Sequence, residues 1–184
     1  ESVAVRRLRS QVRRIAPYFR VALIHGDAGS GKEMVARRMH AGSPGADRPF
    51  IVAEASMVAE HFAHSDRPQS IGIGVVESLL KSAHGGTLYL RGVGRLSSRQ
   101  QAGLRLFLSV HEERRCAAPE NGGARQDLKD ARARLVVSSD RDLRAVAAIG
   151  QFRQDLYAYL SAVEILVPPL RERADDIPAI GEWL

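Results

Sequence analysis

The chain has 184 residues and a mass of 20.1 kDa, with 45% apolar and 26% charged residues. This suits one globular α/β domain with its own core. No apolar run approaches the roughly 20 residues of a membrane-spanning helix, no signal peptide is visible at the start, and the single cysteine excludes an internal disulfide. These features predict a cytoplasmic protein that does not enter a membrane.

Basic residues exceed acidic residues by 27 to 21, which gives a net charge of +6 and a pI near 10.1. Three of the basic residues are lysines (Lys32, Lys81 and Lys129), and the other 24 are arginines. Arginine binds phosphates through paired hydrogen bonds, so the charge suggests a nucleic acid or a nucleotide as ligand. A codon bias that places arginines on solvated faces explains the same excess, so the charge alone leaves both interpretations open.

Hydrophobic periodicity predicts the elements in chain order. The first is an amphipathic helix over residues 3–16, which Pro17 ends. There follow a strand at 21–24, a helix at 32–40, a Gly/Pro-rich loop at 41–49, a strand at 50–53, a helix at 75–83, a strand at 87–90, a helix at 98–110, a loop at 117–129, a strand at 134–138, helices at 143–147 and 152–159, and a strand at 163–167. Residues 57–74 show no clear period, and Pro68, Gly72 and Gly74 favour irregular backbone there. Short apolar strands that alternate with helices predict a mostly parallel sheet with helices on both faces.

A glycine-rich stretch between the first strand and the second helix fits the pattern GxxxxGK. It consists of Gly26, Asp27, Ala28, Gly29, Ser30, Gly31 and Lys32. Its glycines let backbone N–H groups surround a phosphate, the following helix adds its positive end, and Lys32 reaches the β- and γ-phosphates. Glu33 follows, where the general motif has a Ser or Thr whose hydroxyl meets Mg²⁺. We therefore expect these eight residues to bind a nucleotide.

With Glu directly after GK, the sequence GDAGSGKEMVARRMH (26–40) resembles the phosphate loop of the AAA+ domain of bacterial enhancer-binding proteins, which activate sigma-54 RNA polymerase. The resemblance continues through PFIVAEAS (49–56) for the second strand, GGTLYLRGVGRLSSRQQAGLRLFL (85–108) for the Walker B strand and its helix, RLVVSSDRDL (134–143) for the sensor I strand, and QFRQDLYAYLSAVEILVPPLRERADDIP (151–178) for the arginine-finger helix and the start of the lid. The hexapeptide PPLRER (168–173) is among the more specific of these motifs.

This resemblance implies a P-loop NTPase (AAA+) fold, a three-layer sandwich with a mostly parallel sheet. It implies a nucleotide-binding core over residues 1–170 and the start of a truncated helical lid over residues 171–184. It also implies ATP or ADP as ligand, self-association as a dimer or ring, and RNA polymerase or a sigma factor as partner. DNA binding is expected only through a domain outside this chain.

The sequence departs from the family at the end of the Walker B strand, where the family has Asp-Glu. The Asp supports Mg²⁺ and the Glu polarises the attacking water. Here Arg91 and Gly92 occupy these positions, and loss of a positioned base typically costs about 10²–10⁴-fold in rate. We therefore expect little or no hydrolysis, the positive charge of Arg91 argues against Mg²⁺, and we assign no metal ligand. Alternatively, the Arg91 guanidinium pairs with a bound phosphate in place of the metal.

Three further positions and one segment differ from the family. Glu54 replaces an Asn that regulates the catalytic Glu, and Asp140 replaces the sensor I Asn. By this resemblance we expect Asp140, together with Arg37 and Arg91, to belong to the nucleotide site. Arg153 matches one arginine finger and is our candidate for that role, although pairing with Asp155 explains it equally well. Tyr159 replaces the second finger, and residues 57–74 lack the GAFTGA motif that contacts sigma-54.

Our prediction is a nucleotide-binding regulatory module of a bacterial transcriptional regulator with little or no hydrolysis. One alternative is a module that senses cyclic di-GMP, because some regulators without GAFTGA bind it near the phosphate loop through arginines such as Arg37 and Arg38. Another is an active ATPase that remodels sigma-54 RNA polymerase with a substitute carboxylate such as Glu54. The intact GxxxxGK argues against a third alternative, a scaffold that binds no nucleotide.

Overall fold

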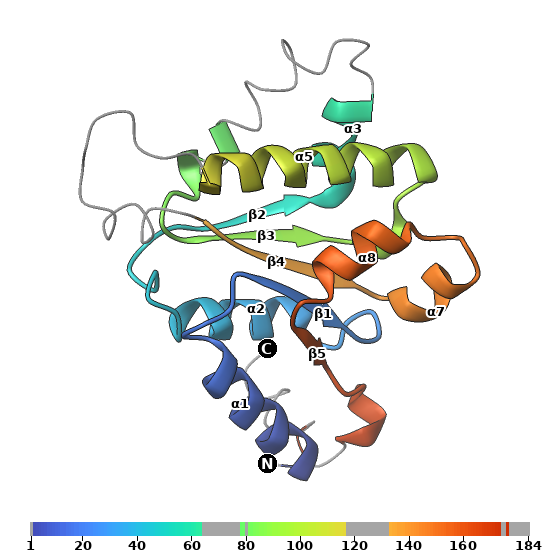
Figure 1. Ribbon diagram of the computed structural model, residues 1–184. Helices are drawn as coiled ribbons and strands as arrows, with labels where there is room; N and C mark the ends of the chain where they lie inside the picture. The colour runs from blue at the N-terminus through green and yellow to red at the C-terminus, as the bar shows by residue number, and fades with distance from the viewer. Residues whose placement is uncertain (1, 64–77, 80, 117–132, 174–175, 177–184) are drawn as a thin grey trace.

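The apolar runs of the sequence pair into a parallel sheet in the computed structural model, which describes residues 2–63, 78, 79, 81–116, 133–173 and 176 (Figure 1). In this part of the chain the strands are β1 (Val21–His25), β2 (Phe50–Glu54), β3 (Thr87–Arg91), β4 (Arg134–Ser139) and β5 (Glu164–Leu166). They lie in the order β2-β3-β4-β1-β5, and each neighbouring pair is parallel. The predicted parallel sheet is confirmed.

Helices cover both faces of this sheet. The helices in the described residues are α1 (Val3–Ile15), α2 (Lys32–Ala41), α3 (Ala55–Ala63), α5 (Ser98–Cys116), α7 (Leu143–Ala148) and α8 (Gln154–Leu160), with single 3-10 turns η1 (Val93–Arg95) and η2 (Leu170–Glu172). Residues 78, 79, 81 and 82 are also helical, within the helix expected at 75–83. None of these helices is both long and apolar enough to cross a bilayer.

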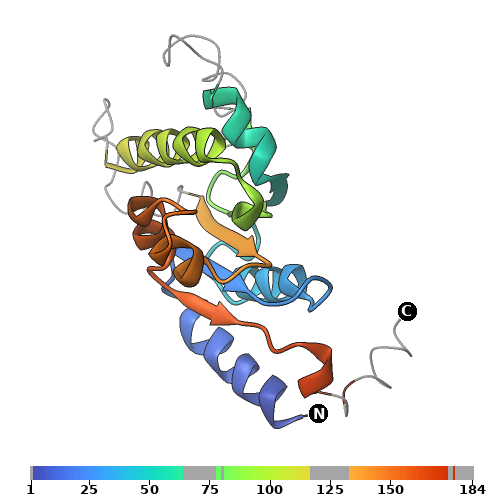
Figure 2. The same ribbon diagram turned by 90° about the vertical axis from the view of Figure 1, so that its right-hand side faces the viewer.

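The core is divided by the sheet into two apolar layers. Side chains of α3, α5, α7 and α8 pack on one face, and those of α1 and α2 pack on the other. Figure 2 shows α2 and the α7–α8 pair on opposite sides of the strands. Alternate residues of the central strands enter different layers, as Leu88 and Tyr89 of β3 do, because successive side chains of a strand point to opposite faces. This is the three-layer sandwich that the sequence predicts.

The structure corrects two of the predicted elements. Residues 55–63 form α3, although irregular backbone was expected from residue 57 onward. Ala55, Val58 and Ala59 follow helical spacing and are buried in the layer that α5 shares, and this short pattern was obscured by the proline and glycines that come later. Helix α5 also continues to Cys116, although the sequence predicted an end at residue 110. Its last residues are mostly polar and show no apolar period, so the pattern did not indicate that the helix continues. Residues 64–74 and the loop expected at 117–129 lie outside the described residues.

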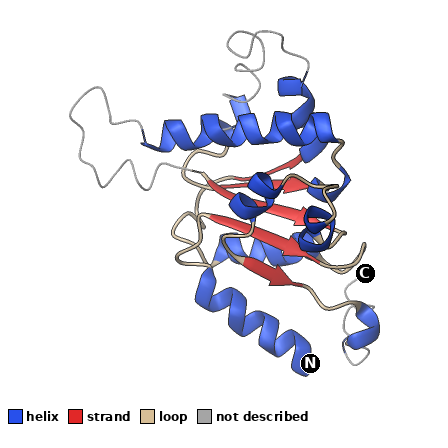
Figure 3. Ribbon diagram, turned by 45° about the vertical axis from the view of Figure 1, so that its right-hand side comes forward, coloured by secondary structure: helices blue, strands red, loops and turns tan. Residues whose placement is uncertain are grey.

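Because the strands are parallel, their carboxyl ends meet at one edge of the sheet (Figure 3). Gly26 follows β1 and Asp140 follows β4, while Glu54 and Arg91 are the last residues of β2 and β3. Ligands of open parallel sheets bind outside this edge. The topology therefore gathers four of the residues singled out in the sequence.

Candidate functional site

The phosphate loop runs from Gly26 to the first turn of α2. Gly26 has a φ of 153°, and a Cβ there would lie 2.5 Å from the carbonyl oxygen of Val167. Gly31, which caps α2, has a φ of 85°, in the left-handed region that other residues rarely adopt. The path of this loop therefore requires glycine at both positions, and the strand–loop–helix context expected for a phosphate loop is present.

Lys32 is the first residue of α2, and its side chain folds back into the loop. Its Nζ donates hydrogen bonds to the carbonyl oxygens of Gly26, at 2.8 Å, and Asp27, at 2.7 Å. Burial lowers the pKa of the Lys32 ammonium, while the charges of Asp140 and Asp27 partly offset that effect. The loop therefore holds a cation at its centre, where a phosphate would meet it.

Two arginines of the PPLRER segment contact the loop from the far end of the chain. The Arg171 guanidinium pairs with the Asp27 carboxylate, Nη1 to Oδ2, at 2.6 Å. The Nη2 of Arg173 donates to the carbonyl oxygen of Ser30 at 2.6 Å. The Ser30 side chain is 2% exposed, and its hydroxyl has no hydrogen-bond partner within the described part of the chain. The sequence marked PPLRER as a family motif but offered no signal that it contacts the loop.

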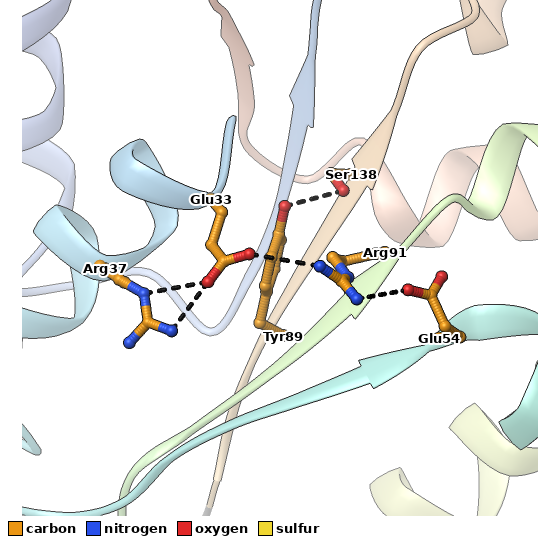
Figure 4. Close-up of polar contacts among 6 residues, drawn as sticks. All are labelled: Glu33, Arg37, Glu54, Tyr89, Arg91 and Ser138. Carbon is orange, nitrogen blue, oxygen red and sulfur yellow. Dashed lines mark hydrogen bonds and ion pairs between the residues drawn. The ribbon is translucent and has the colours of Figure 1, made fainter. Parts of the chain in front are cut away.

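Four charged side chains alternate in sign at the carboxyl edge of the sheet (Figure 4). The Nη2 of Arg91 lies 2.6 Å from Oε1 of Glu54, and its Nη1 lies 3.5 Å from Oε2 of Glu33. The other oxygen of Glu33 accepts from Nε and Nη2 of Arg37 at 3.1 and 2.7 Å. The guanidinium carbon of Arg37 lies 4.7 Å from the centre of the Phe50 ring. Arg91 is thus held between two carboxylates, and we call the set of Glu33, Arg37, Glu54 and Arg91 the charge ladder.

Mg²⁺ is the metal that the family resemblance implies at the charge ladder, and the donor set does not fit it. Mg²⁺ takes oxygen ligands in octahedral geometry at about 2.0–2.1 Å. Arg91 offers only N–H donors, and its positive charge lies between the two carboxylates that could otherwise attract the metal. The expectation that Glu54 substitutes for the lost base is also not supported, because its Oε1 is engaged by Arg91.

Asp140, at the sensor I position, faces Arg95 of η1. The Oδ2 of Asp140 accepts hydrogen bonds from Nε of Arg95, at 2.9 Å, and from its Nη2. The Asp140 side chain is 19% exposed and that of Arg95 is 69% exposed. The pKa of the Asp140 carboxyl lies below its usual value of 3.8, mainly because of these hydrogen bonds from Arg95. Arg95 was not singled out in the sequence, where nothing in its surroundings indicates this pairing.

Replacing Asp140 by Asn is expected to lower stability more at about pH 7 than at about pH 2. Because the pKa of Asp140 is lowered by folding, its stabilising contribution is fully present above the unfolded-state pKa and is lost as the pH falls through the folded-state pKa. Urea titrations of the wild type and Asp140→Asn at both pH values measure the difference in unfolding free energy. A difference of the same size at both pH values would contradict this prediction.

Arg153, the candidate arginine finger, is the N-cap residue of α8. Its Nε and Nη2 pair with the two oxygens of Asp155 at 3.0 and 2.9 Å, and its backbone N–H donates to Oε1 of Gln101 at 2.9 Å. The structural explanation named above, an ion pair with Asp155, is therefore present. The role of a finger toward a second subunit stays a prediction.

The residues from Gly26 to Glu33 thus come together with Arg91 and Asp140 at one edge of the sheet, and their role in nucleotide binding stays a prediction. Arg37 lies one turn further along α2, where its guanidinium is engaged by Glu33 and by the ring of Phe50, the first residue of β2. Arg171 and Arg173 join the loop, and Arg95 joins Asp140. The arrangement offers a glycine-rich loop with Lys32 inside it and arginines around it, and Gly92 rather than a carboxylate stands in the place of the family's base.

Comparisons with known proteins agree with this geometry. The sequence profile described as the sigma-54 interaction domain matches residues 1–166. The Nif-specific regulatory protein of Herbaspirillum seropedicae is 37% identical over 187 residues, a match that covers 98% of this chain and 33% of that protein. The response regulator PilR of Pseudomonas aeruginosa is 36% identical, with 99% of this chain and 41% of that protein covered. The chain thus spans a third to two fifths of the length of these relatives.

Among solved structures, NtrX from Brucella abortus in complex with ATP has a TM-score of 0.72 and 31% identity, covering 99% of this chain and 41% of that one. The same protein in complex with ADP has a TM-score of 0.71 and 32% identity, covering 98% and 40%. The P-loop NTPase domain of a sigma-54 transport activator from E. coli has a TM-score of 0.56 and 19% identity, covering 90% of this chain and 95% of that one. The fold predicted from the sequence, that of a P-loop NTPase, is confirmed.

Proposed function

The chain belongs to the family of sigma-54 interaction domains, and from this premise we propose that it is a nucleotide-binding regulatory module of a bacterial transcriptional regulator. It binds ATP or ADP with little or no hydrolysis. The observation that carries the proposal is the loop between β1 and α2, in which Gly26 and Gly31 adopt backbone conformations suited to glycine and Lys32 points inward.

The choice of ATP or ADP is supported by two lines. A loop of this geometry at a helix N-terminus binds phosphate through backbone N–H groups, and Lys32 adds a point charge. A relative of the same fold, NtrX from Brucella abortus, was solved with each of these nucleotides. The proposal assigns nucleotide contact to the loop residues 26–33.

Little or no hydrolysis is supported by the end of β3. Arg91 stands in place of the metal-supporting Asp, and Gly92, with a φ of 76°, stands in place of the base. This arrangement weighs against an active ATPase that uses Glu54 as substitute, because Arg91 holds that carboxylate. The sequence at 57–74 also lacks the GAFTGA motif, so direct remodelling of sigma-54 polymerase is not part of the proposal.

The proposal extends to partners and domains by family membership. We place the nucleotide core at residues 1–170 and the start of a lid at 171–184. Self-association and contact with RNA polymerase or a sigma factor belong to the regulator of which this module is a part, and we place that regulator in the cytoplasm. Arg153 is assigned as the finger that faces a second subunit.

Calorimetry with ATP, ADP, GTP and cyclic di-GMP tests the proposal. ATP and ADP are expected to bind, and Lys32→Ala is expected to weaken ATP binding about 10- to 100-fold, because one charge-assisted contact to phosphate is lost. Lys81→Ala serves as the matched control, because Lys81 is exposed and precedes the amino end of β3, away from the loop.

Unchanged ATP binding in Lys32→Ala would show that the loop is not the site. If none of the four nucleotides binds, the proposed function as a whole is overturned. Tighter binding of cyclic di-GMP than of ATP would transfer the site to the alternative ligand named above.

A further inference from the structure

We propose that the nucleotide binds at this site without Mg²⁺, because Arg91 supplies the positive charge at the position of the family's metal-supporting aspartate. This inference rests on the proposed nucleotide binding and adds its dependence on the metal. The charge ladder of Glu33, Arg37, Glu54 and Arg91 carries it.

The charge ladder is fixed by the topology of the sheet. Glu54 and Arg91 end β2 and β3 and are direct partners in the parallel register of these strands. Glu33 directly follows the loop lysine in α2. Three separate elements therefore bring the two carboxylates and the guanidinium to the same place, at the start of α2, directly after the glycine-rich loop (Figure 4).

The guanidinium of Arg91 already contacts one oxygen of each of these carboxylates. Arg91 reaches Glu54 at 2.6 Å and Glu33 at 3.5 Å through different nitrogens, and Arg37 occupies the second oxygen of Glu33 at 2.7 Å. Glu33 and Glu54 therefore both have an arginine partner already, and neither is left to attract a metal. A divalent cation would have to displace Arg91 or lie beside it against charge repulsion.

Further cations surround the phosphate loop itself. Lys32 lies inside the loop, Arg171 contacts Asp27, and Arg173 contacts the Ser30 carbonyl. The carboxylates that face this region are Asp27, Glu33 and Asp140, and each has an arginine partner in Arg171, Arg37 and Arg95 respectively. A triphosphate without its metal is more negative than the metal complex, and Lys32 and Arg173, which donate to backbone carbonyl oxygens of the loop rather than to carboxylates, supply positive charge toward it without a divalent ion.

The test is a calorimetric titration of the chain with ATP, once in excess EDTA and once with saturating MgCl₂. The wild type is expected to bind ATP in EDTA, and saturating MgCl₂ is expected to raise its apparent Kd by more than about tenfold, because it converts nearly all of the ATP into the Mg²⁺ complex, which the charge of Arg91 disfavours. Arg91→Asp places a third carboxylate between Glu33 and Glu54, so ATP binding in EDTA is expected to weaken about 10- to 100-fold. MgCl₂ is expected to restore much of that loss in Arg91→Asp.

Two further variants make the comparison specific. Arg91→Lys keeps the charge and loses the second N–H contact, so its ATP binding in EDTA is expected to fall between the wild type and Arg91→Asp. Arg20→Asp makes the same charge change at an exposed residue before the amino end of β1 and is expected to behave as the wild type. Circular dichroism on each variant confirms that it is folded, and Arg91→Lys tests the inference even where Arg91→Asp does not fold.

The outcomes separate this inference from the proposed function. Wild-type binding of ATP with MgCl₂ that disappears in EDTA would overturn the inference and leave nucleotide binding intact. No ATP binding in either buffer would overturn the proposed function. As a measurement that needs no variant, Mn²⁺ electron paramagnetic resonance of the wild-type protein with ATP is expected to show the spectrum of Mn²⁺–ATP in solution, and a new protein-bound Mn²⁺ signal would overturn the inference.

Discussion

ATP hydrolysis by this chain is expected to be about 10²–10⁴-fold slower than hydrolysis by a member of its family whose third strand ends in Asp-Glu. The positioned base is replaced by Gly92, which has no side chain to polarise water. The neighbouring carboxylate of Glu54 lies 2.6 Å from a nitrogen of Arg91 and is engaged in an ion pair. Phosphate release at saturating ATP and MgCl₂, measured side by side for the two domains, gives the ratio.

Two variants accompany this measurement. Lys32→Ala is the control for background, because phosphate release that persists in this variant does not come from the loop. Gly92→Glu alone is not expected to restore hydrolysis, because Gly92 has a φ of 76°, where a side chain costs about 1–2 kcal/mol, and Arg91 still stands beside it. Release at the rate of the family member, lost in Lys32→Ala, would contradict the prediction.

Truncation of Phe107 to Ala is expected to lower the free energy of unfolding by about 3–5 kcal/mol, through lost burial and the cavity left behind. Phe107 lies in α5, is 0% exposed, and belongs to the apolar layer between α5 and the sheet. The free energy of unfolding of an ordinary domain is about 5–15 kcal/mol in total. This single truncation would therefore remove a large part of the stability of the protein. Urea titrations followed by circular dichroism measure the change.

Tyr18→Ala is the matched control for Phe107→Ala, because it also truncates an aromatic side chain. Tyr18 is 83% exposed, so its loss is expected to change the free energy of unfolding by no more than about 0.5 kcal/mol. If Phe107→Ala were as mild as Tyr18→Ala, α5 would not pack on the sheet as described.

The periodicity of the sequence predicted the order of strands and helices well because buried parallel strands form continuous apolar runs. Residues 87–90 and 134–138, for example, lie within β3 and β4. It failed at α3, where the buried face is only Ala55, Val58 and Ala59, and at the end of α5, where polar residues continue the helix. Short or polar helices leave little periodic signal, and their packing partners are distant in the chain.

By itself the sequence determined the phosphate loop, since its glycines and Lys32 act through backbone geometry over a few neighbouring residues. It also determined that the Asp and Glu of the family's third strand are replaced, because Arg91 and Gly92 stand at the end of that strand in the sequence itself. Only the tertiary structure decided what Arg91 pairs with, since Glu33 and Glu54 reach it through the strand order β2-β3-β4-β1-β5. The same holds for Arg171, which contacts Asp27 across 144 residues of sequence. Ion pairs between the ends of separate elements depend on how the sheet is ordered, and no local spacing records that order.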